Sequence, residues 1–119
     1  MGDHNTFGKL GEQKAIDFLK ASGYQIVRQN YRYLKAEIDI IARQGDILVI
    51  IEVKSRTSGF LEDISNTINP KKIKLLTMAA NHFVEEMEDD VEVRFDIITV
   101  IKYADRFDIE HIENAFYHF

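Results

Sequence analysis

The chain has 119 residues, of which 45% are hydrophobic and 29% are charged, and it contains no cysteine. This composition is typical of one globular domain, and the absence of cysteine excludes a disulfide scaffold, a zinc-thiolate site and thiol catalysis. No apolar run approaches the roughly 18 residues that cross a bilayer. We therefore expect a soluble, cytoplasmic protein without a membrane partner, organised as a single domain over residues 1–119, with a flexible leader at 1–5 and a C-terminal extension at 103–119.

The first half of the chain predicts one helix followed by three strands. Apolar residues recur near a 3.6-residue period over residues 6–21, which predicts an amphipathic helix. Weak alternation over residues 24–33 predicts a first strand. Residues 36–43 and 47–56 are rich in Ile and Val and flank Gly45-Asp46, which is typical of the two-residue turn of a β-hairpin.

The second half predicts a loop, a second helix and two more strands. Residues 57–69 are polar and aperiodic, so we expect a mobile loop beside the hairpin. Asn69 is placed to cap a helix that opens with a proline and continues to about residue 87. Alternation predicts a strand over residues 91–102, and the apolar positions of residues 107–119 predict an edge strand with a short helical or irregular end.

Charge is distributed unevenly along the chain. Residues 1–84 hold 12 Lys and Arg against 9 Asp and Glu, a net charge of +3, whereas residues 85–119 hold 3 against 11, a net charge of -8, which together give the -5 of the whole chain. Because affinity for a polyanion comes largely from Lys and Arg, the first two thirds could face a nucleic acid. Scattered charges that only solvate the surface are the alternative explanation.

The predicted hairpin brings acidic and basic side chains together. With a two-residue turn, Asp39 faces Glu52 and Glu37 faces Lys54, and alternation puts all four side chains on one face of the sheet. Two ionised carboxylates about 5 Å apart repel by about 3–4 kcal/mol at an effective dielectric of roughly 20, so we expect a counter-charge. Oxygen donors without His or Cys favour Mg²⁺ or Mn²⁺, and Lys54 would then orient a water for attack on a phosphodiester. A network of salt bridges is the alternative.

Four segments, GKLGEQKA, AEIDIIA, IIEVKSRT and VRFDIITV, occur in this order and resemble the YraN-like family of uncharacterised bacterial proteins. An acid on one strand followed by Glu-x-Lys after a hairpin also resembles the PD-(D/E)XK nuclease superfamily, which includes type II restriction enzymes and archaeal Holliday junction resolvases. The resemblance covers about residues 7–101. It implies an α/β fold with a restriction endonuclease-like αβββαβ core, a mixed sheet flanked by helices.

The resemblance also implies roles for individual residues. Asp39 and Glu52 match the metal-binding acids, Lys54 matches the catalytic lysine, and Glu12 matches an acid on the first helix that completes the metal site. An acid early in a helix is also favoured by the helix dipole alone, which is the simpler explanation for Glu12. Glu37 matches the first acid of the family's EID segment.

Three further groups of residues are considered beside these acids. Arg56 shares the face of Lys54, where it either holds a phosphate or pairs with Glu37 as part of a secondary site. Arg94 and Asp96 match an RFD segment of the family to which we assign no role. The four histidines have no metal-ligand spacing and are interpreted as structural or surface residues.

These features predict a Mg²⁺-dependent endonuclease that hydrolyses phosphodiester bonds in DNA rather than RNA, with branched or structured DNA as a candidate substrate. Symmetric cutting would suit a homodimer. The residues expected to contact nucleic acid are Lys9, Arg32, Lys35, Arg56, Lys71 and Lys74. The alternatives are a catalytically weak nucleic-acid-binding or adaptor module that retains the fold, and a metal-free scaffold that binds protein through its acidic last third.

Overall fold

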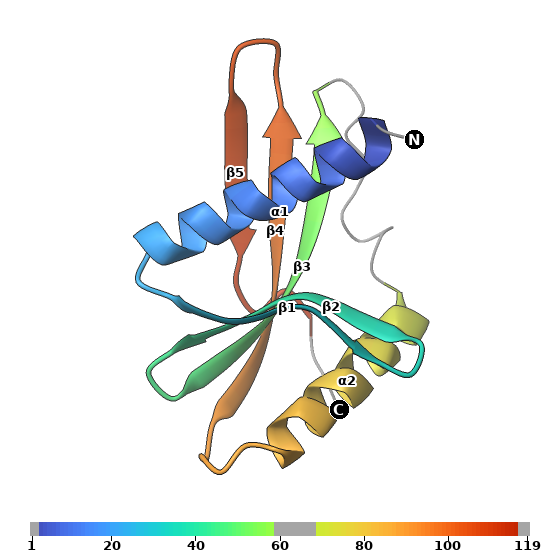
Figure 1. The fold of residues 1–119 in the computed structure, drawn as a ribbon, viewed down its shortest axis with the longest axis vertical. Coiled ribbons are helices and arrows are strands. Elements are labelled where there is room, and N and C mark those ends of the chain that lie inside the picture. Colours follow the sequence, from blue (N-terminus) through green and yellow to red (C-terminus); the bar gives the residue numbers. More distant parts are fainter. Residues whose placement is uncertain (1–2, 59–68, 117–119) are drawn as a thin grey trace.

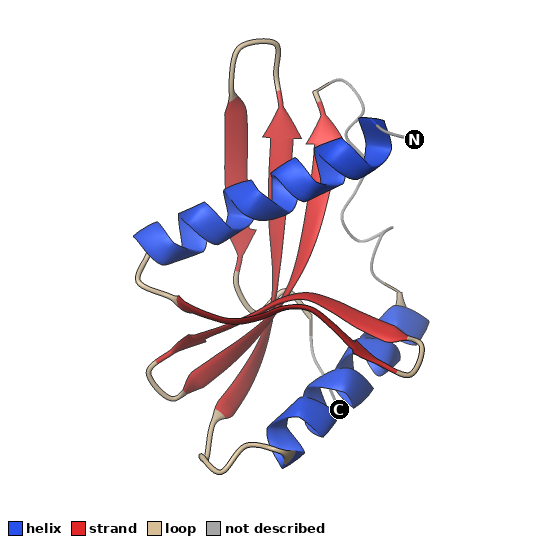
Figure 2. Cartoon of the chain, viewed as in Figure 1, coloured by secondary structure: helices blue, strands red, loops and turns tan. Residues whose placement is uncertain are grey.

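The structure, a computed structural model, describes residues 3–58 and 69–116 and contains a five-stranded sheet with two helices (Figures 1 and 2). In chain order the elements are α1 (Asp3–Ala21), β1 (Gln25–Tyr33), β2 (Ala36–Gln44), β3 (Ile47–Thr57), α2 (Pro70–Glu85), β4 (Glu92–Lys102) and β5 (Phe107–Ile112). This order confirms the predicted α/β class, and the architecture is compatible with a restriction endonuclease-like core. Most of the loop expected over residues 57–69 lies outside the described ranges.

The sheet is mixed, with the spatial order β1-β2-β3-β4-β5. The pair formed by β3 and β4 is parallel, and the other neighbouring pairs are antiparallel. A parallel pair needs a crossover connection, and α2 lies in the segment between β3 and β4. Within the part of the chain that the structure describes, no helix is both long and apolar enough to cross a membrane.

Each face of the sheet packs against one helix, which explains the uninterrupted Ile and Val runs of the central strands. On one face, the buried side of α1 packs against β2, β3 and β4 through Ala15, Ile16, Leu19, Ile40, Val49, Ile51 and Ile98. On the other face, α2 packs against the same strands through Leu76, Ala79, Phe83, Ile38, Ile41, Ile50 and Phe95. The two helices therefore fix both sides of the hairpin that carries the predicted site.

Local signals set most element ends, with differences of a few residues. The side chain of Asn69 accepts a hydrogen bond from the backbone N of Lys72 at 2.9 Å, which confirms the predicted cap, and Pro70 is the first residue of α2. Helix α1 begins at Asp3, three residues before the predicted start at residue 6, and α2 ends at Glu85 rather than at residue 87.

A second hairpin joins β1 to β2 through a two-residue turn, because Tyr33 pairs with Ala36. Leu34, in this turn, has a φ of 56° and is 75% exposed. A positive φ is costly for a leucine, and the turn contains no Gly, Asn or Asp that would have predicted it. An apolar side chain is thus held in solvent at the tip of this hairpin by a strained backbone.

The strands β2 and β3 separate halfway along their length. The predicted register is confirmed from Gln44–Ile47 to Ile40–Ile51. Beyond that point, β2 continues to pair with β1 and β3 continues to pair with β4, so the sheet divides into two arms. In Figure 1, the β1–β2 hairpin turns toward α2 while β3 and β4 run upwards. We call this point of separation, at Asp39 and Glu52, the fork.

The fork corrects one geometric expectation. The register predicts that Asp39 pairs with Glu52 and Glu37 with Lys54, but the backbone ladder between the two strands ends before these positions. The reason is a side chain in the place of a backbone acceptor, because the N–H of Val53 donates to Oδ2 of Asp39 at 2.8 Å. The acids therefore meet where the sheet opens rather than on a continuous flat face.

Candidate functional site

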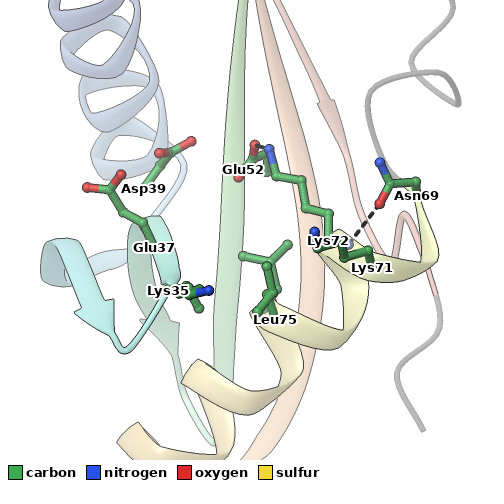
Figure 3. A pocket seen from close by; sticks show the side chains of 10 residues that line it. Lys35, Glu37, Asp39, Glu52, Asn69, Lys71, Lys72 and Leu75 are labelled. Carbon is green, nitrogen blue, oxygen red and sulfur yellow. Dashed lines mark hydrogen bonds and ion pairs between the residues drawn. The ribbon is translucent and has the colours of Figure 1, made fainter.

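A pocket with a volume of about 340 Å³ lies at the fork, between the separating strands and the start of α2 (Figure 3). Its lining residues are Lys35, Ala36, Glu37, Asp39, Glu52, Asn69, Lys71, Lys72, Leu75 and Leu76. The acids come from β2 and β3, and the lysines come from the β1–β2 turn and from the first turns of α2. The structure thus brings Glu37, Asp39 and Glu52 into one pocket with a basic side.

Asp39 lies at the point where the side chains of β2 switch from one face of the sheet to the other. Ile38 packs in the cluster with α2 and Ile40 in the cluster with α1, although residues two apart share one face of a regular strand. Opposite this point on β1, Asn30 has a φ of 51°, and the pairing of β1 with β2 passes from Gln29–Ile40 to Tyr31–Ile38 around it. Asp39, between Ile38 and Ile40, therefore lies at the boundary between the two helix-covered layers.

The Asp39 carboxyl is electrostatically perturbed. Burial, and secondly the charge of Glu52, raise the pKa of Asp39 to about 7, while the hydrogen bond from the N–H of Val53 opposes the shift. The charge of Glu12 raises it further and that of Lys72 lowers it. A carboxyl with a pKa near neutrality in a pocket is a candidate functional group, and a cation bound beside it would lower that pKa.

Glu52 is held by two ammonium groups. Its side chain is only 7% exposed, and Oε2 lies 3.1 Å from Nζ of Lys54, two residues further along β3. The same oxygen forms an ion pair with Nζ of Lys72, which reaches across the pocket from the first turn of α2 (Figure 3). Burial acts to lower the pKa of Lys72, but its hydrogen bond to Glu52 and the charge of Glu52 raise it above the usual value.

Glu12 approaches the same acids from α1. Burial, followed by the charges of Glu37 and Glu52, raises the pKa of Glu12, and a side-chain hydrogen bond with Asn30 counteracts this. The helix can come this close to β3 because the preceding residue is glycine. A Cβ atom at Gly11 would lie 1.9 Å from Oγ of Ser55, so only glycine fits this crossing without displacing a neighbour.

The remaining predicted residues differ in whether they line the pocket. Glu37 pairs with Arg32 through Oε2 and Nε at 3.5 Å, so its described ion pair is with β1 rather than with Lys54. Nη1 of Arg56 donates to the backbone O of Ser55 at 3.1 Å. The predicted nucleic-acid contacts that line the pocket are Lys35 and Lys71, whereas Lys9 and Lys74 are exposed on α1 and α2.

The donor chemistry of the fork fits a hard divalent cation. Asp39 and Glu52, with Glu12 as a third candidate, offer only carboxylate oxygens, which are the ligands that Mg²⁺ and Mn²⁺ prefer. Their mutual repulsion and burial raise the pKa of Asp39 to about 7, and a divalent charge between them would relieve both effects. Over residues 3–58 and 69–116, no three His, Asp or Glu side chains already stand close enough to hold an ion. A cation at Glu52 would compete there with the ion pairs to Lys54 and Lys72.

A second polar cluster accounts for the RFD segment. Asp96 is fully buried and accepts hydrogen bonds from Nε and Nη2 of Arg94 at 2.9 and 2.8 Å and from the backbone N of Asn114 at 2.9 Å. His111 lies 2.7 Å from the same carboxylate through Nε2, and Arg94 also donates to the hydroxyl of Tyr24. Burial acts to raise the pKa of Asp96, but His111, Arg94 and Asn114 together lower it. This cluster ties β4 to β5 and to the start of β1.

Sequence reasoning missed Lys72 as a residue of the site. It names Lys71 and Lys74 as nucleic-acid contacts but not Lys72, which is the lysine of α2 with a described ion pair to Glu52. The helix period separates the directions of adjacent lysines, but which of them meets Glu52 depends on how α2 packs on the sheet. The role of Asp96 was also missed, since two of its partners, His111 and Asn114, belong to the next strand, β5, and the residues after it.

The fold and the pocket define a class: an α/β protein compatible with a restriction endonuclease-like core, with an acidic pocket where its sheet divides. The family model described as "Uncharacterised protein family UPF0102" matches residues 11–100. The chain is 48% identical to the UPF0102 protein of Christiangramia forsetii over 119 residues, which is all of both chains, and equally to UPF0102 protein FP2501 of Flavobacterium psychrophilum. It is 40% identical to UPF0102 protein BF0634 of Bacteroides fragilis over 117 residues, 98% of this chain and 97% of that one.

The chain belongs to the UPF0102 family, which is the YraN family that its four motifs resemble. The family model spans α1 from Gly11 through most of β4, so it includes Glu12, the fork and the Arg94–Asp96 pair.

Proposed function

We propose that this protein is a Mg²⁺- or Mn²⁺-dependent endonuclease that hydrolyses phosphodiester bonds in DNA. The observation that carries the proposal is the meeting of Asp39 and Glu52 at the fork, with Nζ of Lys54 3.1 Å from Glu52. This arrangement also resembles the PD-(D/E)XK nucleases. It consists of an acid on one strand and, on the next strand, a second acid with a lysine two residues later, and the two strands separate around a pocket.

The chemistry assigns a task to each of these residues. Hydrolysis forms a bond from a water oxygen to phosphorus and breaks the bond to the leaving sugar oxygen, while a proton leaves the water and another reaches the sugar oxygen. A divalent cation supplied at Asp39 and Glu52 would stabilise charge on the phosphoryl oxygens and lower the pKa of a nearby water. Lys54 would orient the water and balance the negative charge that develops at phosphorus.

The charge around the pocket supports an anionic substrate. Lys35 and Lys71 line the pocket itself, and Arg32 and Lys74 are exposed on the elements that form its rim. Lys71 and Lys72, which line the pocket, lie in the first turn of α2, and the helix continues from there to Glu85. The acidic stretch that begins at Glu85 therefore starts at the opposite end of α2 from these lysines. Branched DNA and a homodimer that cuts both strands are extensions of this proposal.

A second candidate is a DNA-binding module that does not cut. The observation that favours it is the pairing of Glu52 with both Lys54 and Lys72, which neutralises one proposed ligand without any metal. A module of this kind would keep the basic rim and bind DNA with the usual salt dependence.

A cleavage panel separates the two candidates. Linear duplex, single-stranded and four-way junction DNA are incubated with the protein in Mg²⁺, in Mn²⁺ and in EDTA. The proposal predicts cutting of at least one substrate only with a divalent cation, and a loss of about 100-fold or more in Lys54→Ala. Lys20→Ala removes the same charge from an exposed position in the last turn of α1, outside the predicted DNA contacts, and serves as the matched control, which keeps most of the rate. Binding of all three substrates without any metal-dependent cutting would favour the module instead.

A further inference from the structure

We propose that Lys72 is an exchangeable counter-ion of the acidic site: it holds Glu52 when no divalent cation is bound, and it pairs with the DNA backbone once a cation has displaced it. This inference rests on the proposed function, because it presumes that the acids of the fork take a cation. It adds a residue that the motif of two acids and one lysine does not contain.

The attachment of Lys72 makes it the more easily displaced of the two lysines. Its side chain is 34% exposed, against 18% for Lys54, while Glu52 is nearly enclosed at 7%. Lys54 comes from the same strand as Glu52, two residues away, so strand geometry keeps the pair together. Lys72 comes from another element and reaches Glu52 only through an extended side chain (Figure 3). The long side chain can therefore leave Glu52 without any movement of α2.

The backbone of Lys72 is fixed at a position from which its side chain can reach either Glu52 or a DNA phosphate at the pocket. Its N–H donates to the capping Asn69, and Asn69 itself lines the pocket. Neighbouring Lys71 and, across the pocket, Lys35 line the same cavity. An ammonium that leaves Glu52 thus stays beside two other cations at the pocket, where a phosphate of a bound strand would be paired.

The balance of charge explains why a cation should displace one lysine. Three acids, Glu12, Asp39 and Glu52, repel one another at the fork, and the two ammonium groups compensate part of that charge. A divalent cation bound to Glu52 would stand within a few ångströms of both lysines and repel them. Release of Lys72 removes one repulsion and creates a free cation for DNA, so cation and DNA should bind with positive coupling.

Binding of Mn²⁺ to the free protein tests this inference without any turnover. Mn²⁺ affinity is measured by calorimetry for the wild type, Lys72→Gln, Lys72→Arg and Lys71→Gln. If Lys72 competes with the cation, Lys72→Gln should bind Mn²⁺ about tenfold more tightly, a difference of about 1.4 kcal/mol. Lys72→Arg, which keeps the charge, and Lys71→Gln, which removes a neighbouring charge, should stay close to the wild type. A thermal melt of each variant verifies that it is folded.

The pairing of displaced Lys72 with DNA is tested by measuring DNA affinity in variants that also carry Lys54→Ala, which prevents cutting. Mn²⁺ should increase DNA affinity less when Lys72→Gln is added than when Lys71→Gln is added. Equal or weaker Mn²⁺ affinity in Lys72→Gln than in the wild type would overturn the inference and leave the proposed function standing. Absence of Mn²⁺ binding in the wild type would overturn both.

Discussion

Replacing Asp39 by Asn should stabilise the protein at alkaline pH in the absence of divalent cations. Burial and the charge of Glu52 raise the pKa of Asp39 from 3.8 to about 7. The native protein therefore binds more protons at this site than the unfolded chain does between pH values of about 4 and 7, so the free energy of unfolding falls as the pH rises through that window. An asparagine carries no charge, and its amide oxygen can still accept the hydrogen bond from the N–H of Val53.

The size of this effect follows from the shift in pKa. A change from 3.8 to about 7 corresponds to about 4 kcal/mol above pH 7, as an upper limit. Because Asp39 keeps some exposure to solvent, we expect Asp39→Asn to raise the free energy of unfolding above pH 7 by about 2 kcal/mol. For a domain of this length, that gain raises the melting temperature by roughly 5–10 °C.

Thermal and urea unfolding at pH 8 and pH 4.5, in EDTA, measure the effect. Asp39→Asn should have a higher free energy of unfolding and a higher melting temperature than the wild type at pH 8. Most of this difference should disappear at pH 4.5, where the native carboxyl is protonated. Asp108→Asn, an exposed acid on β5, is the control and should show no such dependence on pH. In a buffer without EDTA, Mn²⁺ should raise the melting temperature of the wild type but not that of Asp39→Asn. A variant that is less stable at both pH values, or more stable by the same amount at both, would refute the electrostatic reasoning.

Four further substitutions test the packing and backbone geometry of the fold. Gly11→Ala should lower the free energy of unfolding by about 1–3 kcal/mol, because its Cβ would lie 1.9 Å from Oγ of Ser55. Gly8→Ala is the control and should raise the free energy of unfolding by up to about 1 kcal/mol, because its Cβ meets nothing within 4 Å. Equal urea midpoints of the two variants would contradict this. Asp96→Asn should cost about 3–5 kcal/mol in urea unfolding, since it removes the charge of a fully buried carboxylate that is paired with half-buried Arg94. A loss below about 1 kcal/mol would show that the cluster is dispensable. Leu34→Gly should stabilise by up to about 1 kcal/mol in thermal unfolding, because glycine adopts the φ of 56° freely; a destabilised variant would mean that this exposed side chain packs.

The elements that sequence predicts well are those set by neighbouring residues. The cap at Asn69 and the proline after it place the start of α2, and Gly45-Asp46 places the hairpin turn and hence the register of β2 on β3. Runs of Ile and Val identify strands that are covered on both sides. Each of these signals acts over a few residues and does not depend on how distant elements pack.

The features that sequence did not predict depend on contacts between elements. The fork arises where the Asp39 side chain takes the place of a ladder acceptor and where Asn30, opposite it, adopts a positive φ. The turn at Leu34 has no residue that favours its conformation. The pairing of Lys72 with Glu52 requires α2 to be docked on the sheet, so it cannot be deduced from spacing within the chain. Sequence thus indicated the acids of the site but not the cations that hold them.

The most direct test of the central claim is the anomalous scattering of Mn²⁺ in crystals of the protein soaked in a manganese salt. The account predicts one Mn²⁺ at the fork, about 2 Å from carboxylate oxygens of both Asp39 and Glu52, with Nζ of Lys72 withdrawn from Glu52. A fork without manganese at saturating concentration, in which Glu52 is still paired with Lys54 and Lys72, would contradict it.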